Sequence, residues 1–120
     1  MIEQALRNWL VANTALPSAQ VHFIRAIQGT PKPYAVISRI VDADNDTHDG
    51  TDGTAEGVWQ VSVFDTSLSG LKGTCSAVRG LSGATVTGAA RIIKSGEVDL
   101  YEQDAGVYHT AMRFLIQYYT

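Results

Sequence analysis

The C-terminal stretch of the chain sets the strongest constraint on the fold, because its side chains alternate between apolar and polar along its whole length. An alternation with a period of two is typical of a β-strand with one buried and one solvated face. Such a strand needs sheet partners and a covering layer, so the chain must build a sheet with a core on one side. The apolar face carries Tyr108, Met112, Phe114, Ile116 and Tyr118, and the polar face carries His109, Arg113 and Gln117.

Further strands follow from the same kind of pattern. Residues 58–65 alternate tryptophan and valine with polar side chains, which predicts a strand buried on one face. Strands are also predicted at 21–28 and at 34–41, and the second of these is rich in β-branched residues. An extended segment is expected at 91–102, bulged near Gly96, and residues 103–106 favour a hairpin turn.

Two segments carry helical periodicity instead. The first begins near the N-terminus and ends before Pro17, because proline disfavours helical geometry at the residue before it. The second is predicted over residues 68–81, although three glycines weaken it. Spacings of three and four place apolar side chains on one stripe of each helix. These stripes are Ile2, Ala5, Leu6, Trp9 and Leu10 in the first helix and Leu68, Leu71, Cys75, Val78 and Leu81 in the second.

The segment from Asp42 to Gly57 differs from the rest of the chain. It holds six acidic residues and no apolar residue larger than alanine, so it cannot cover a core. We expect it to form a long, mobile, exposed loop between strands, and loops of this length are often functional.

These elements predict one domain over residues 1–120 of the α+β class, with a mostly antiparallel sheet and both helices packed on one face. A hydrophobic share of 45% is ordinary for a globular chain. The net charge of −3 and the lack of Lys and Arg clusters argue against direct nucleic-acid binding. No apolar run reaches the length of a membrane span or of a secretory signal. Cys75 has no partner for an internal disulfide, which favours a reducing compartment.

No motif for catalysis, for a cofactor or for a metal is complete in the sequence. The serine and glycine spacings match neither a nucleophile elbow nor a phosphate-binding loop. Asp42, Asp44 and Asp46 alternate as in a calcium loop, but Thr47 and Gly53 stand where that loop requires glycine and glutamate. We therefore predict no catalytic, cofactor or metal site. Cys75 lies on an apolar stripe and is interpreted as a small buried hydrophobe.

The residues that we expect at an interface are polar or aromatic and exposed. Tyr119 points away from Tyr118, which leaves a tyrosine on the surface, and exposed tyrosine is enriched at interfaces. The acidic segment supplies the other candidates. The complete set is Asp44, Asp46, His48, Asp49, Asp52 and Tyr119.

Three passages resemble the tail terminator, or tail completion, proteins of long-tailed bacteriophages. Residues 28–36 read QGTPKPYAV, like the Pro-Tyr passage that opens an early strand of that family. Residues 57–65 are similar to its central strand, which a helix follows. Residues 100–109 are similar to its C-terminal hairpin, where acidic residues and glycine precede an aromatic.

This resemblance implies a structural role without enzymatic activity and without a cofactor. Copies of such a protein join head-to-tail into a ring, usually a hexamer, at the head-proximal end of the tail tube. The ring stops tube polymerisation and offers the surface that joins the head. Its implied partners are further copies of itself, the tail tube protein and a head-side connector or closure protein. DNA crosses the ring without specific binding, no membrane is involved, and the product resides in the virion after assembly in the host bacterial cytoplasm.

Three other interpretations stay open from the sequence. The chain could be another neck or tail subunit of the same particle, such as a head-closure or tube protein. It could be an unrelated binding module, which would be a stable monomer with a pocket. A small hydrolase or isomerase would need converging titratable groups that no motif displays.

Overall fold

The computed structural model describes residues 2–14, 16–17, 20–24, 33–43, 54–102 and 106–119. Within these ranges the chain forms two helices and five strands that belong to one sheet. The elements are α1 (Ile2–Asn13), β1 (Val21–Phe23), β2 (Tyr34–Ala43), β3 (Thr54–Asp65), α2 (Leu68–Arg79), β4 (Ala89–Glu102) and β5 (Val107–Tyr119).

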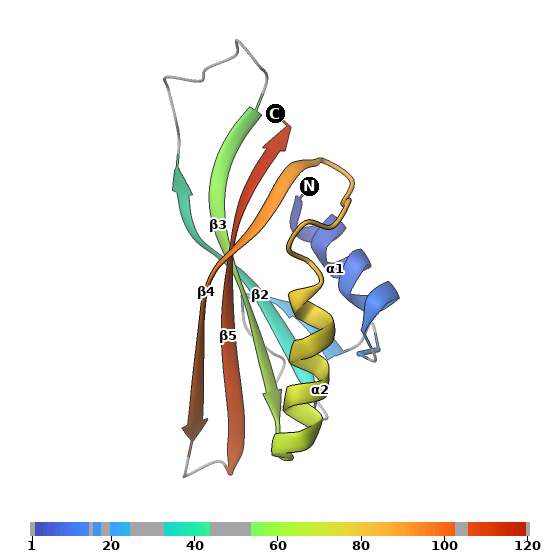
Figure 1. The fold of residues 1–120 in the computed structure, drawn as a ribbon, viewed down its shortest axis with the longest axis vertical. Coiled ribbons are helices and arrows are strands. Elements are labelled where there is room, and N and C mark those ends of the chain that lie inside the picture. The colour runs from blue at the N-terminus through green and yellow to red at the C-terminus, as the bar shows by residue number, and fades with distance from the viewer. Residues whose placement is uncertain are drawn as a thin grey trace.

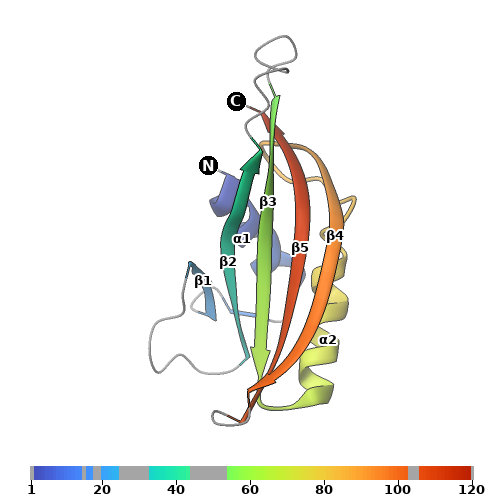
Figure 2. The ribbon, with the colours of Figure 1, turned by 90° about the vertical axis from the view of Figure 1, so that its left-hand side faces the viewer.

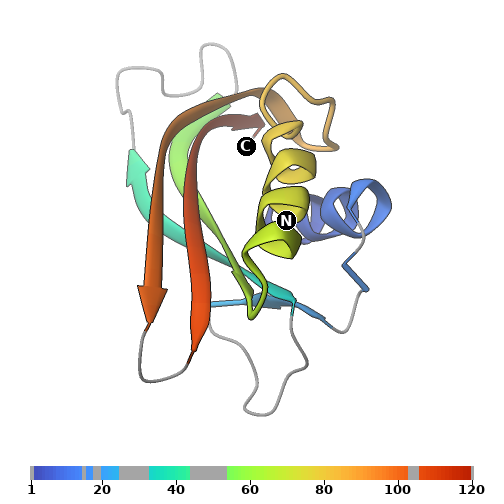
Figure 3. The same ribbon diagram turned by 60° about the horizontal axis from the view of Figure 1, so that its bottom comes forward.

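The sheet has the strand order β1-β2-β3-β5-β4. β1 runs parallel to β2, and each of the other neighbouring pairs is antiparallel. Both helices lie on the same face of the sheet (Figures 1 and 3). The predicted α+β class, with a mostly antiparallel sheet and helices on one face, is therefore confirmed.

β5 lies beside two strands and pairs with β3 and β4 along nearly its whole length. Its apolar face behaves as its alternation predicts: Met112, Phe114 and Ile116 are fully buried, and Tyr108 and Tyr118 pack against the core. The sheet thus has one face turned to the helices and one face without a helical cover.

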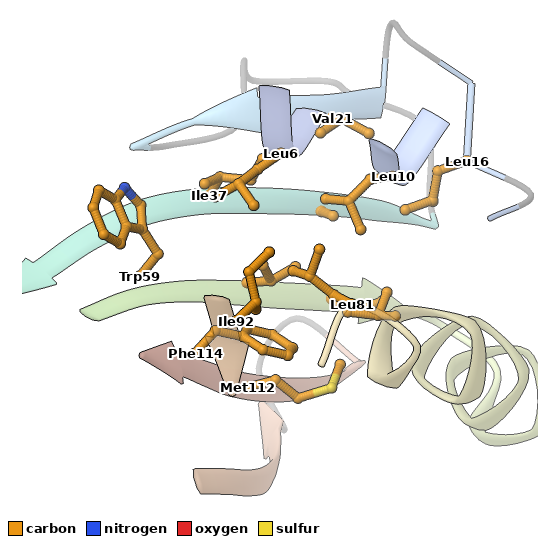
Figure 4. Close-up of a cluster of buried hydrophobic side chains, with 14 of the residues drawn as sticks. Leu6, Leu10, Leu16, Val21, Ile37, Trp59, Leu81, Ile92, Met112 and Phe114 are labelled. Atoms are coloured by element: carbon orange, nitrogen blue, oxygen red, sulfur yellow. The ribbon is translucent and has the colours of Figure 1, made fainter. Parts of the chain in front are cut away.

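The core fills the space between the sheet and the two helices (Figure 4). Leu6 and Leu10 enter it from α1, and Leu71, Cys75 and Val78 enter it from α2 on the same face of the sheet. Trp59 is the largest of the fully buried side chains. Burying one leucine or valine of this kind contributes about 1.5–3 kcal/mol, so the apolar stripes are sufficient reason for the helices to dock.

The start of α1 is held by a polar contact at the rim of this apolar layer. Glu3 Oε2 accepts hydrogen bonds from Trp59 Nε1 and from Arg39, each at 3.0 Å. The Arg39 guanidinium also lies 5.4 Å from the centre of the Trp59 ring, a cation–π distance. Burial alone would raise the pKa of Glu3, but these hydrogen bonds outweigh it and hold the pKa below its usual value.

The start of α2 explains one of the glycines that weaken the helix in sequence terms. Ser67 is the N-cap, and its hydroxyl accepts from the Gly70 N–H at 3.2 Å. Asp65 accepts from the Ser67 N–H at 3.1 Å. A Cβ on residue 70 would lie 2.5 Å from Asp65 Oδ2, so glycine is the residue that lets this cap close. The helix ends at Arg79, two residues before the predicted end, because residues 80–83 turn.

Several predicted boundaries are wrong. The acidic loop predicted from Asp42 to Gly57 is shorter, because Asp42 pairs with Gly57 and Ala43 pairs with Glu56. β3 begins at Thr54, opposite Tyr119 of β5. Backbone hydrogen bonds carry the ladder past the last large apolar side chain, and β5 offers β3 a continuous template. The rest of the predicted loop, residues 44–53, lies outside the described residues.

Two other strand predictions are corrected at their ends. The first strand, predicted over 21–28, stops at Phe23 because Ile24 has a φ of 71°, which is outside the extended region. Residues 25–28 lie outside the described residues. β4 starts at Ala89, two residues before the predicted position, and the predicted bulge is confirmed by a register shift between Lys94 and Gly96.

The core predicts a large effect for a leucine on the buried face of α1. We expect Leu6→Ala to lower the free energy of unfolding by about 2–5 kcal/mol, because it removes a fully buried side chain and leaves a cavity. Asn8→Ala, on the exposed face of the same helix, is the matched control and should change stability by less than about 0.5 kcal/mol. Urea titration followed by circular dichroism measures both. Equal losses in the two variants would contradict this account of the core.

Candidate assembly surface

The helix-free face of the sheet is turned to the viewer in Figure 2. It carries a row of stacked rings across three strands. Tyr34 of β2 stacks on Phe64 of β3 with ring centres 4.8 Å apart, and Phe64 stacks on His109 of β5 at 4.2 Å. Cross-strand register continues the row to Leu100 of β4. The rings are half-buried, so this part of the face is preformed and does not need a partner to order it.

Apolar side chains of β4 extend this face toward the edge of the sheet. Val98 is 56% exposed and Leu100 is 51% exposed. They border an open groove of about 690 Å³ whose lining also includes Val58, Ala111 and Arg113. Exposed apolar residues that gather beside polar ones mark surfaces that other molecules cover.

The outer edge of β4 is closed at one end and open at the other. The Gly83 N–H donates to the Ile92 carbonyl at 2.9 Å, and the Lys94 N–H donates to the Ser82 hydroxyl at 3.1 Å. The turn after α2 therefore covers this part of the edge. From Gly96 onward, no described residue hydrogen-bonds to the outer edge of β4. An unpaired edge of this kind is a template for another strand.

Ion pairs fix the open part of β4 to α2 on the other face. Arg79 binds both carboxylate oxygens of Glu97, at 2.9 and 2.7 Å, and Lys94 Nζ lies 3.0 Å from the same group. The hydrogen bonds from Arg79 are the main cause that lowers the pKa of Glu97 to about 2. The open edge is therefore held in place and charged at neutral pH.

Asp99 lies next along the same edge and has two partners. The Thr110 hydroxyl donates to it at 2.8 Å, and Lys72 Nζ lies 3.4 Å from its second oxygen. These two contacts, with the Thr110 hydrogen bond foremost, hold the pKa of Asp99 below its usual value. Its side chain is still 55% exposed, so one side of the carboxylate faces solvent.

One of the interface residues predicted from sequence can be placed. Tyr119 is 60% exposed and pairs with Thr54, where β3 begins. Its predicted exposure is confirmed, while its role at an interface stays a prediction. Asp44, Asp46, His48, Asp49 and Asp52 lie outside the described residues. The sequence reasoning missed the aromatic row and the exposed pair Val98 and Leu100, whose alternate positions in a predicted strand were the available signal.

Other chemistry is sparse in the part of the chain that the structure describes. No three His, Cys, Asp or Glu side chains of those residues converge on a point where a metal ion could bind. Cys75 is 1% exposed, and burial raises the pKa of its thiol, which confirms its interpretation as a buried hydrophobe. Neither described helix combines the length and apolarity needed to cross a membrane.

Comparison with known proteins identifies the family of this chain. The family described as tail completion protein gp17 matches residues 4–119. The chain belongs to that family. Its members are structural proteins and not enzymes, so this chain is a non-enzymatic tail component of a phage-like virion. The resemblance seen in the three sequence passages is thereby confirmed.

Solved structures agree on the fold. A chain from a structure titled "Virion of native gene transfer agent (GTA) particle" superimposes with a TM-score of 0.75 at 19% sequence identity. The match covers 99% of this chain and 95% of that chain. No curated protein sequence matches the chain.

The Arg79–Glu97–Lys94 cluster predicts a pH-dependent contribution to stability. A carboxyl with a lowered folded-state pKa stabilises above its unfolded pKa, and this stabilisation is lost as the pH falls through the folded value, here about 2. We expect Glu97→Gln to cost about 1–2 kcal/mol at pH 7, after allowance for partial exposure, and almost nothing near pH 2. In an Arg79→Met background the cost at pH 7 should shrink, as unfolding titrations of the double-mutant cycle will measure. A cost that is the same at both pH values would argue against the ion pair.

Proposed function

We propose that this tail completion protein forms a ring at the head-proximal end of the tail tube, ends tube polymerisation and offers the surface that joins the head. The family match over residues 4–119 carries this proposal, because it covers almost the whole fold. The ring is a homo-oligomer, and we propose a hexamer. The tail tube protein and a head-side connector or closure protein are its partners.

The form of the subunit supports assembly rather than binding of a small molecule. A ring needs heterologous contacts, in which one surface of a subunit meets a different surface of the next. The helix-free face, the exposed residues of β4 and the open edge beyond Gly96 supply surfaces that a neighbour can cover. The ion pairs of Glu97 and Asp99 hold this edge rigid before assembly, which lowers the entropic cost of association.

A second candidate is another neck or tail subunit, such as a head-closure or tube protein. The open edge of β4 also suits a tube protein, since tube subunits associate in the same heterologous manner. The two candidates differ in what happens after the first ring forms. A tube protein adds further rings, whereas a terminator stops growth.

We further propose that the acidic segment and Tyr119 act at an interface or along the DNA channel. The segment 42–57 holds six of the twelve acidic residues and no Lys or Arg. Negative charge repels DNA phosphates, which would let DNA pass without sticking.

Removing the protein from an assembling particle tests the proposed role. Tubes that lack the terminator should grow beyond their normal length and fail to join heads, because nothing blocks the addition of subunits. Negative-stain electron microscopy of tails made with and without the gene measures tube length, and complementation with the wild-type protein is the control. If tubes are absent altogether without the gene, the chain is a tube protein and the terminator role is wrong.

Neutralising the acidic segment tests its part in DNA passage. We expect the fourfold Asp→Asn variant at 44, 46, 49 and 52 to form normal tails but to slow DNA ejection, because phosphate repulsion inside the channel is lost. Ejection kinetics and plaque counts measure this effect. The control is the conservative Asp→Glu variant at the same positions. Wild-type assembly and infectivity in the Asn variant would rule out the charge hypothesis.

A further inference from the structure

The two edge strands of the sheet, β1 and the open part of β4, lie at the same level and run in opposite directions. One row of paired residues crosses the sheet from Val21 in β1 to Asp99 in β4, through Ala35, Val63 and Thr110. The adjacent row runs from His22 to Val98, and the row after that runs from Phe23 to Glu97. β1 and the open part of β4 therefore end the same rows at the two opposite edges of the sheet. The pairings between neighbouring strands make β1 and β4 run in opposite chain directions.

At both edges, backbone N–H and C=O groups point out of the sheet, where another strand could pair with them. Ile92 and Lys94 direct their backbone groups outward, to Gly83 and Ser82. Backbone groups alternate between the two sides of a strand, and the bulge after Lys94 shifts that alternation by one residue. The N–H and C=O of Glu97 and Asp99 consequently face outward.

The same reasoning applies to β1. The Ile24 N–H donates to the Ile37 carbonyl, so Ile24 and, by alternation, His22 direct their groups toward β2. Val21 and Phe23 then direct theirs away from the sheet. Arg7 Nε of α1 lies 3.4 Å from the Val21 carbonyl, a long contact that a backbone N–H can replace.

We propose that the open edge of β4 pairs in antiparallel fashion with β1 of a second copy of this chain. Asp99 lies opposite Val21 of the second copy, and Glu97 lies opposite its Phe23. The proposal rests on the ring of the proposed function and names the contact that builds it. Because the joined edges are different surfaces of identical subunits, the contact is heterologous and closes into a ring when it repeats with rotation.

Side chains on both faces suit this pairing. On the helix-free face, Val98 lies beside His22 of the second copy, and Ile24 of that copy, itself 80% exposed, falls opposite Gly96. A side chain at Gly96 would meet nothing within 4 Å, so there is room for this contact. Two exposed apolar residues thereby leave water, and burial of apolar area favours association.

Charges are complementary on the helix face. Arg7 lies at the β1 edge, next to the Val21 carbonyl. Asp99 lies at the β4 edge with more than half of its side chain exposed, beside the carboxylate of Glu97. The pairing brings the Arg7 guanidinium of one copy to the Asp99 carboxylate of the other, and complementary charges at the rim of an interface favour encounter and orientation.

Cysteine cross-linking tests the contact. Residues 22 and 98 form a non-hydrogen-bonded pair in this arrangement, with Cα atoms about 4.5 Å apart, a distance that a disulfide spans. The double variant His22→Cys, Val98→Cys should form covalent multimers up to the size of the ring on mild oxidation, and mixed single variants should stop at dimers. The matched control replaces Val98→Cys by Ile93→Cys, on the same face of the same strand, and should not cross-link. Cys75 stays in place because it is buried.

A second pair of variants separates the strand contact from loss of side-chain interactions. Asp99→Pro removes the outward N–H that the partner needs, whereas Asp99→Ala removes the same side chain and keeps the N–H. Circular dichroism checks that both fold. We expect rings on tail ends with the alanine variant and none with the proline variant.

The outcomes separate the two proposals. If the wild-type protein forms rings but the double cysteine variant does not cross-link between residues 22 and 98, this contact is wrong and the terminator role stands. The same holds if residue 98 cross-links to a tube protein instead. A wild-type protein that forms no ring on tail tubes, and does not limit their length, would overturn the proposed function and this contact together.

Discussion

Burial of one face of a five-stranded sheet is the interaction on which the rest of this structure depends. Leu6 and Leu10 from α1 and the buried stripe of α2 cover that face, and Trp59, Met112 and Phe114 fill the space between. Two helices suffice to cover one face of the sheet and leave the other uncovered. The helix-free face and the edge of β4 are therefore consequences of how the core is covered, and they are also where the protein meets other subunits in our proposal.

Polar contacts at the sheet act on geometry more than on total stability. Glu97 and Asp99 bind side chains of α2, and Glu3 binds Trp59 and Arg39. Partly exposed ion pairs contribute little free energy each, but they fix the position of a strand that has only one strand neighbour. A subunit that presents a sheet edge benefits from this rigidity, because an edge that is already extended loses less entropy when a partner strand arrives.

The sequence predicts most of the fold because its strands and helices bury one face each, and burial leaves a periodic pattern. β5 is the clearest example, since Met112, Phe114 and Ile116 are all buried as their spacing indicates. The ends of strands are less predictable because backbone hydrogen bonds extend the ladder regardless of side chains, as at Asp42–Gly57 and Ala43–Glu56. The sequence also did not show why residue 70 is a glycine. The cause is the close approach of Asp65, which belongs to a different element of the fold. On the helix-free face, the exposure of Tyr119 was the one feature predicted from the sequence. The open edge of β4 was not predicted, because an exposed edge depends on strand order, which periodicity does not specify.

The bulge after Lys94 has a consequence for how this chain can change over time. On its N-terminal side, even-numbered residues of β4 face the helices, whereas beyond it the odd-numbered Glu97 and Asp99 do so. The bulge is one extra residue, so its loss would join both halves of β4 into one regular strand in which the two carboxylates still face α2. By contrast, loss of one residue beyond the bulge would turn every later side chain of β4 to the opposite face of the sheet. Divergent relatives can therefore lose the bulge, but they should keep the residue count of the strand that follows it.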